Sequence, residues 1–119
     1  MAEHILALDL GTTGVRALIV HASGRVVGQA WRALDASFPS PGWVEQDPGQ
    51  MWNRSVEVMR ESLAKAPLGV GDIAALGVVS QRSPAIAWEA HSETPLHPAL
   101  GGQDGRTSAR VAELVALGV

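Results

Sequence analysis

The 119-residue sequence has no cysteine, no excess of basic residues and no long uninterrupted apolar run. Without cysteine there is neither a disulfide framework nor a thiolate metal site. The net charge of −3 provides no basic surface, so nucleic acid is not expected as a partner. Asp9, Gly11 and Arg16 interrupt the longest apolar stretch, and the N-terminus lacks the basic region of a signal peptide. These absences predict a cytoplasmic protein with no membrane partner.

What is present is an ordinary globular composition, with 46% apolar and 18% charged residues. A chain of this length holds one core and is too short for two comfortable domains.

A polar turn, Gly11-Thr12-Thr13-Gly14, separates two short aliphatic runs near the N-terminus. Both runs, Ile5–Leu10 and Val15–Val20, predict strands, because each is too short for a helix. Glycine supplies the positive φ that tight turns require. The segment therefore predicts a β-hairpin.

The same hairpin has a functional interpretation. The amides and hydroxyls of Gly11, Thr12 and Thr13 would cradle phosphates, Asp9 would hold Mg²⁺ through water, and Arg16 would add positive charge. Alternatively, Asp9 only caps the amides of the following loop in an Asx-type turn. Spacing alone leaves both interpretations open.

A third strand is expected over Arg25–Leu34, so that three strands form an antiparallel meander. The segment Phe38–Trp43 is irregular, because it holds two prolines and a glycine. A helix follows, with Asp47 as N-cap, Pro48 at its first position and Gln50 completing a capping box. The helical spacing of its apolar residues predicts a buried stripe formed by Trp52, Val56, Met59 and Leu63. Pro67 and Gly69 are expected to end this helix.

The run Ile73–Val79 predicts a strand buried on both faces beside the first strand. Short strands are expected over Ala85–Glu89 and near Ala99 and Leu100. A last helix spans Thr107–Leu117 and ends at Gly118, with its inward side formed by Val111, Leu114 and Val115. A meander followed by a helix crossover and a parallel strand indicates an α/β fold with a mixed sheet.

Two further loops carry polar groups that suit a ligand site. Arg82 and Ser83 follow the carboxyl end of the expected buried strand, where open α/β sheets place ligands. Asp104 lies in a glycine-rich loop before the last helix. Taken singly, the arginine is a solvated loop residue and the aspartate a helix cap.

Together the motifs resemble a known family. The stretches "ILALDLGTTGVRALIV", "PGWVEQDPGQMW", "DIAALGVVSQR" and "GGQDGRT" are similar, in order and spacing, to those of the FGGY carbohydrate kinases, most of all the glycerol-kinase-like members. The resemblance covers essentially the whole chain. The first motif alone also resembles chaperone-type ATPases, which have no use for the "PGWVEQDP" loop.

The resemblance implies an actin-like, ribonuclease-H-like domain in an ATP-dependent kinase that phosphorylates a sugar or polyol hydroxyl. It implies ATP and Mg²⁺ as cofactors, with Asp9 associated with the metal and with phosphates bound by Thr12, Thr13, Gly14 and Arg16. Arg82 resembles an arginine that binds substrate hydroxyls, and Ser83 and Asp104 are expected beside it.

Two positions depart from the glycerol kinase pattern. Ser83 stands where that pattern has an acidic residue, and Gly102 stands where it has a tryptophan. We expect unfilled volume at Gly102 and a substrate longer than glycerol.

The family's catalytic base and second lobe come later in much longer chains. Residues 1–119 are thus expected to be an incomplete N-terminal piece of a kinase whose full-length form is a candidate homo-oligomer. The piece alone is expected to be inactive. The alternative is a non-catalytic module of the same fold that binds nucleotide or a partner.

Overall fold

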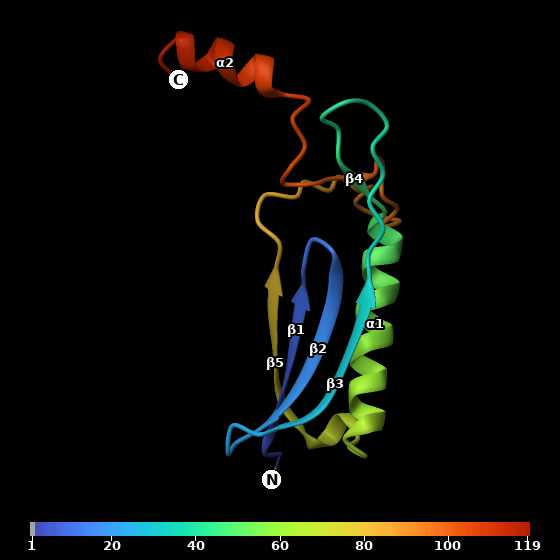
Figure 1. Ribbon diagram of the computed structural model, residues 1–119. Coiled ribbons are helices and arrows are strands. Elements are labelled where there is room, and N and C mark those ends of the chain that lie inside the picture. The colour runs from blue at the N-terminus through green and yellow to red at the C-terminus, as the bar shows by residue number, and fades with distance from the viewer. Residues whose placement is uncertain (1) are drawn as a thin grey trace.

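A computed structural model describes residues 2–119 (Figure 1). Its elements, in chain order, are β1 (His4–Leu10), β2 (Gly14–His21), β3 (Val26–Ala33), β4 (Glu45–Gln46), α1 (Pro48–Lys65), a 3₁₀ turn (Val70–Asp72), β5 (Ile73–Ser80), β6 (Ala99–Leu100) and α2 (Ser108–Ala116).

The main sheet has four strands in the order β3-β2-β1-β5. The first three strands pair antiparallel as a meander, and β5 pairs parallel with β1 after the α1 crossover. The predicted mixed α/β sheet is therefore confirmed. A small second sheet pairs β4 with β6, which confirms the short strand expected at Ala99 and Leu100.

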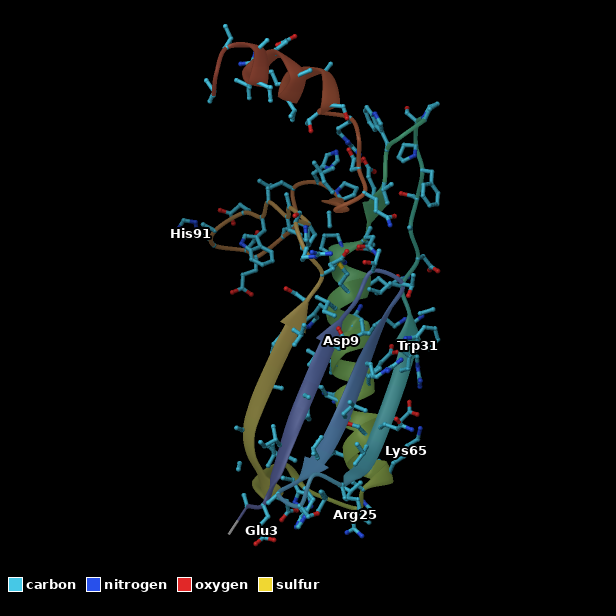
Figure 2. All side chains as sticks on the ribbon, turned by 60° about the vertical axis from the view of Figure 1, so that its left-hand side comes forward. Glu3, Asp9, Arg25, Trp31, Lys65 and His91 are labelled. Carbon is cyan, nitrogen blue, oxygen red and sulfur yellow. The ribbon has the colours of Figure 1, made fainter. Side chains whose placement is uncertain are left out.

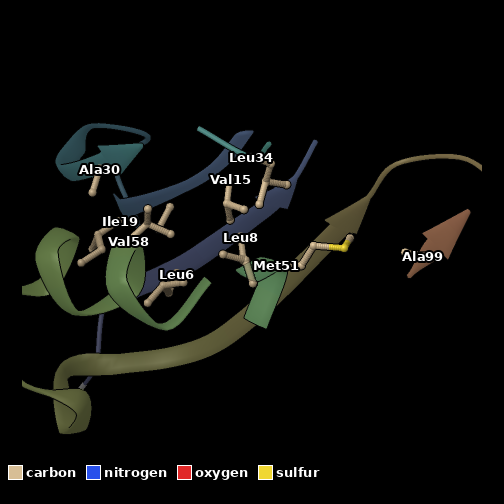
Figure 3. Packing of buried hydrophobic residues seen from close by; sticks show 10 residues of the cluster. Leu6, Leu8, Val15, Ile19, Ala30, Leu34, Met51, Val58 and Ala99 are labelled. Atoms are coloured by element: carbon tan, nitrogen blue, oxygen red, sulfur yellow. The ribbon is translucent and has the colours of Figure 1, made fainter. Parts of the chain in front are cut away.

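Helix α1 covers one face of the meander and creates the core beneath it (Figures 1 and 3). Side chains alternate along each strand, so every second residue of β1 and β2 points to this face. The buried apolar residues are Leu6, Leu8, Val15, Ala17, Ile19, Ala30, Leu34, Met51, Val58 and Ala99.

The predicted stripe of α1 is confirmed at Met59 and Leu63, which are partly buried against the core, but is wrong at Trp52 and Val56. Trp52 is 69% exposed and Val56 is only partly buried, whereas the helix buries Met51, Ser55, Val58 and Ser62. The reason is a close approach at Gly28 of β3, where an added Cβ would lie 2.3 Å from the Ser62 carbonyl oxygen. Small residues suit such a contact, and both serine hydroxyls donate to carbonyls of their own helix.

The start of α1 is as predicted except for its capping box. The Asp47 carboxylate accepts from the Gly49 N–H at 2.8 Å, and Pro48 occupies the first turn. Gln50 does not reach back to the cap. Its amide instead pairs with Asp35, through the Asp35 N–H and carboxylate, at 2.8 Å in both bonds. The expected capping box is therefore wrong, because a neighbouring loop supplies better partners.

Strand β5 is not buried on both faces as expected. Leu76 is 55% exposed and Val79 is 66% exposed, because β5 is one of the two edge strands of the sheet and α1 packs mainly on β2 and β3. The strand expected over Ala85–Glu89 is also wrong. Only isolated bridges form there, from Ala85 to Leu100 and from Trp88 to Pro95.

Helix α2 projects away from the sheet (Figure 1). None of its residues is buried, so the inward side expected at Val111, Leu114 and Val115 is wrong. Its end is as predicted: Gly118 has φ +78°, and the Val119 N–H donates to the Leu114 carbonyl, as in a Schellman motif. The radius of gyration of 17.9 Å exceeds the value of about 13.5 Å for a compact domain of this length.

Across residues 2–119, no helix has both the length and the apolar character that crossing a membrane requires.

Candidate functional site

The hairpin between β1 and β2 turns its carbonyl oxygens inward. The Gly14 oxygen accepts from the Gly11 N–H, and the Thr13 oxygen accepts from the Leu34 N–H, both at 3.0 Å. The Thr12 oxygen accepts from Gln46 Nε2 at 2.8 Å. The carbonyl oxygens of the turn are therefore already hydrogen-bonded to other groups of the chain.

Two residues of the same turn, Thr12 and Thr13, have donors that face outward. Thr12 and Thr13 are exposed, and within the described residues neither their N–H groups nor their hydroxyls make a hydrogen bond. A loop whose carbonyls are bound and whose N–H groups are free presents positive partial charge to its surroundings. Such a surface suits an anion.

Glycine is required at Gly14 for steric reasons. A Cβ there would lie 2.5 Å from Trp31 Nε1 and 2.6 Å from the Arg32 carbonyl oxygen. The turn thus packs against β3 so closely that a side chain would push it outward.

Asp9 and Arg16 lie directly opposite one another on β1 and β2. Because their chain neighbours Leu8 and Val15 are buried in the core against α1, both point to the other face of the sheet, and Figure 2 labels Asp9 there. With Trp31 of β3 and Val79 of β5 they form one row across the sheet. Asp9 is exposed, and its carboxylate accepts no hydrogen bond from any residue in the range 2–119, so the Asx-type turn is not formed. This carboxylate lies at the end of the strand that leads into the hairpin.

Arg82 and Ser83 lie beside Thr12 of the hairpin. Thr12, Gln81, Arg82, Ser83, Gly102 and Gln103 line one open hollow of about 380 Å³. The tertiary structure thus brings a threonine of the turn to the loop that was expected to bind substrate. Ser83 adopts φ +63°, a left-handed conformation that is uncommon outside glycine and concentrates at functional sites.

Gly102 does not leave the unfilled volume that was expected. A Cβ at this position would lie 2.5 Å from the Arg82 carbonyl oxygen. The backbone of the Arg82 loop already occupies the space that a side chain would enter, so that expectation is corrected.

Asp104 has all its acceptor positions filled by its own chain. One carboxylate oxygen accepts from Arg106 N at 3.0 Å and from Arg106 Nε at 2.8 Å. The other accepts from Val44 N at 2.7 Å and from Arg106 Nη2 at 2.8 Å. The hydrogen bonds from Arg106 hold the pKa of the Asp104 carboxyl well below its usual range, and the same contact raises the pKa of Arg106.

The Arg106 guanidinium joins this aspartate to the loop before α1. It contacts Glu45 at 2.8 Å and lies over the Trp43 ring, 3.9 Å from the ring centroid. The cluster ties two segments of the chain together and leaves Asp104 without a free lone pair for another ligand. A role for Asp104 in substrate contact stays a prediction.

Sequence reasoning singled out no function for Gln46, Glu45 or Arg106. All three lie inside the motifs "PGWVEQDPGQMW" and "GGQDGRT", which carried the family resemblance. Membership in those motifs was the only signal that could have pointed to them.

The sheet order and the hairpin at its first turn define the class of this protein, a mixed α/β fold of the actin-like ATPases, present as a partial domain. The chain belongs to the FGGY family of carbohydrate kinases, whose N-terminal domain model matches residues 4–118.

Relatives of known name agree with this assignment. The chain is 42% identical over 114 residues to a glycerol kinase of Methylorubrum extorquens (strain PA1), with 96% of this chain and 23% of that protein covered. It is 42% identical over 118 residues to a glycerol kinase of Leifsonia xyli subsp. xyli, covering 99% of this chain and 23% of that protein. The solved structure of a xylulose kinase from Rhodospirillum rubrum matches with a TM-score of 0.84 and 32% identity, over 95% of this chain and 23% of the other. The chain thus spans about a quarter of the length of these relatives.

Proposed function

We propose that this chain is the N-terminal part of an ATP-dependent kinase that transfers the γ-phosphoryl group of ATP to a hydroxyl of a sugar or polyol. The observation that carries the proposal is the hairpin, with its carbonyls bound inside and the N–H groups of Thr12 and Thr13 unbonded outside. Together with Gly11, Gly14 and Arg16 they form the proposed phosphate-binding part.

Mg²⁺ fits the proposed site. The ion prefers oxygen ligands and is usually bound through one or two carboxylates, waters and phosphate oxygens. The exposed Asp9 carboxylate, unbonded within the described residues, matches that pattern at the end of β1. When bound with ATP, the metal would neutralise charge on the phosphates.

We place the substrate on the Arg82 side of the shared hollow. The Arg82 guanidinium would donate to substrate hydroxyls, and the Ser83 hydroxyl would donate or accept one further bond. We propose that Asp104 lies near the substrate hydroxyls as well, and its hydrogen bond from Val44 N supports this by fixing the loop that contains Gln103. Positioning of the acceptor hydroxyl against bound phosphate is the main contribution that a kinase makes to phosphoryl transfer.

A sugar or polyol substrate is supported by the names of two relatives, a glycerol kinase and a xylulose kinase. Because Ser83 carries no charge, we propose a longer polyol or a pentose-sized ketose rather than glycerol. The test compares kcat/KM for glycerol with that for four- to seven-carbon polyols and ketoses, using the longest protein that carries this chain. A preference for glycerol would refute the substrate assignment, and no ATP-dependent phosphorylation of any compound would refute the kinase.

The second candidate is a non-catalytic module that binds nucleotide or a partner. It is favoured by one observation, that the unbonded N–H groups of Thr12 and Thr13 would bind nucleotide phosphate with or without turnover. This candidate would be supported if proteins that carry this chain bind inorganic triphosphate but phosphorylate no sugar or polyol. Cytoplasmic location and oligomeric state stay predictions.

A further inference from the structure

One buried side-chain amide bridges the two halves of the candidate site. Gln46, at the end of β4, is only 4% exposed. Its Nε2 donates to the Thr12 carbonyl oxygen, and its Oε1 accepts from Gln81 Nε2, with both bonds 2.8 Å long. A single residue therefore contacts the phosphate hairpin and the segment that precedes Arg82.

The contact with Gln81 sets the start of the substrate loop. The Gln81 N–H donates to the Leu10 oxygen at 2.9 Å, which extends the parallel pairing of β5 with β1 by one residue. Gln81 Nε2 also lies 3.5 Å from the Gly11 oxygen. Because Arg82 and Ser83 follow immediately, a fixed Gln81 limits where they lie relative to the hairpin.

The contact with Thr12 sets the direction of a donor. In a trans peptide the C=O of one residue and the N–H of the next share a rigid plane and point in opposite directions. Holding the Thr12 oxygen inward therefore aims the Thr13 N–H outward. In the same way, the contact of Gln81 with the Gly11 oxygen aims the Thr12 N–H outward.

We propose that Gln46 is a positioning residue of this site: it orients the free N–H groups of the hairpin toward phosphate and fixes their spacing to the Arg82–Ser83 loop. The inference rests on the proposed kinase function. The inference adds Gln46 to that function as a residue that lies outside the hairpin and the substrate loop and acts through both.

The test uses Gln46→Glu in the 119-residue chain. This isosteric change keeps an acceptor for Gln81 but places a carboxylate oxygen against the Thr12 oxygen. The matched control is Gln50→Glu, because Gln50 also bridges through both atoms of its amide, but to Asp35 and away from the hairpin. Amide NMR signals of Thr12, Thr13 and Ser83 are compared, and the affinity for inorganic triphosphate is measured.

We expect shifted Thr12 and Thr13 signals and an affinity about tenfold weaker in Gln46→Glu, with neither change in the control. Lowering the pH protonates the new carboxyl and restores a donor to the Thr12 oxygen. The affinity of Gln46→Glu relative to wild type should therefore recover toward acid pH, a response that general loss of stability would not produce.

Wild-type affinity in Gln46→Glu, or an equal loss in Gln50→Glu, would overturn the positioning role. If the wild-type chain itself does not bind triphosphate, the phosphate cradle of the proposed function fails. The NMR signals then decide alone, and unchanged Thr12 and Thr13 signals in Gln46→Glu would overturn the inference.

Discussion

The contact between Gly28 and α1 provides the sharpest prediction about how this fold holds its site in place. In Gly28→Ala the new Cβ would lie 2.3 Å from the Ser62 oxygen and 2.9 Å from the Ala66 Cβ. Ordinary contacts with a Cβ begin near 3.4 Å, so helix and strand must separate by about an ångström. The nearest atom belongs to the helix backbone and cannot rotate away.

Overpacking of this kind costs about 1–3 kcal/mol in the free energy of unfolding. Gly77 in β5 provides the matched control, since nothing lies within 4 Å of a Cβ built there. Gly77→Ala should be neutral or stabilise by up to about 1 kcal/mol, because alanine restricts the unfolded chain.

The assay is urea unfolding of both variants and the wild type, followed by circular dichroism. With a urea dependence of roughly 1–3 kcal/mol per M, a loss of about 2 kcal/mol lowers the midpoint of Gly28→Ala by about 1 M. The midpoint of Gly77→Ala should stay near that of the wild type or above it. Equal midpoints for the two variants would show that α1 does not approach β3 as closely as described.

Further predictions concern chemistry and pH. In the longest protein that carries this chain, Asp9→Asn should lower kcat far more than it raises the KM for the sugar or polyol. The reason is that a metal-associated carboxylate, the role proposed for Asp9, acts on the transferring phosphoryl group. Steady-state kinetics with the preferred substrate checks this, and an effect on that KM alone would contradict it. The 119-residue chain by itself should show no turnover above blank in a coupled assay with polyols and ketoses, since the base and second lobe implied by the family lie outside it. Hydrogen bonds from the Ser92 backbone N–H and from His91 lower the pKa of Glu89 to about 2 from its unfolded value of 4.5. The folded loop should therefore keep this stabilisation above pH 4.5 and lose it as the pH falls toward 2; slow amide exchange at Ser92 that persists unchanged through this range, or in Glu89→Gln, would argue against it.

Local features of the sequence were enough to predict the meander and the start of α1. Alternating or aliphatic runs joined by glycine-rich turns specify antiparallel neighbours, since the strands are too short and too close to pair otherwise. The N-terminus of α1 depends on Asp47 and Pro48, which act within one turn of chain. The hairpin residues that we propose to bind phosphate were equally visible, because they are consecutive in the sequence.

Which face of α1 is buried was decided only by tertiary packing. Apolar spacing favoured Trp52 and Val56, but the helix buries Ser55 and Ser62 instead, and at Ser62 its backbone comes close to Gly28. A helical pattern records which residues are apolar, not how near a neighbouring backbone comes. The same limit applies to β5, whose aliphatic run does not reveal that it is an edge strand of the sheet and that α1 packs mainly on β2 and β3.

The connections within the site also required the fold. Gln46 and Gln81 are 35 positions apart, and Asp104 reaches Val44 across 60 positions. Their hydrogen bonds depend on where β4, β5 and the Asp104 loop come to lie, and residue type alone does not state that a glutamine amide will have two buried partners. The sequence by itself therefore determined the family and suggested which residues could bind, while the tertiary structure decided which of them meet, because hydrogen bonds form only between groups that packing has brought within about 3 Å.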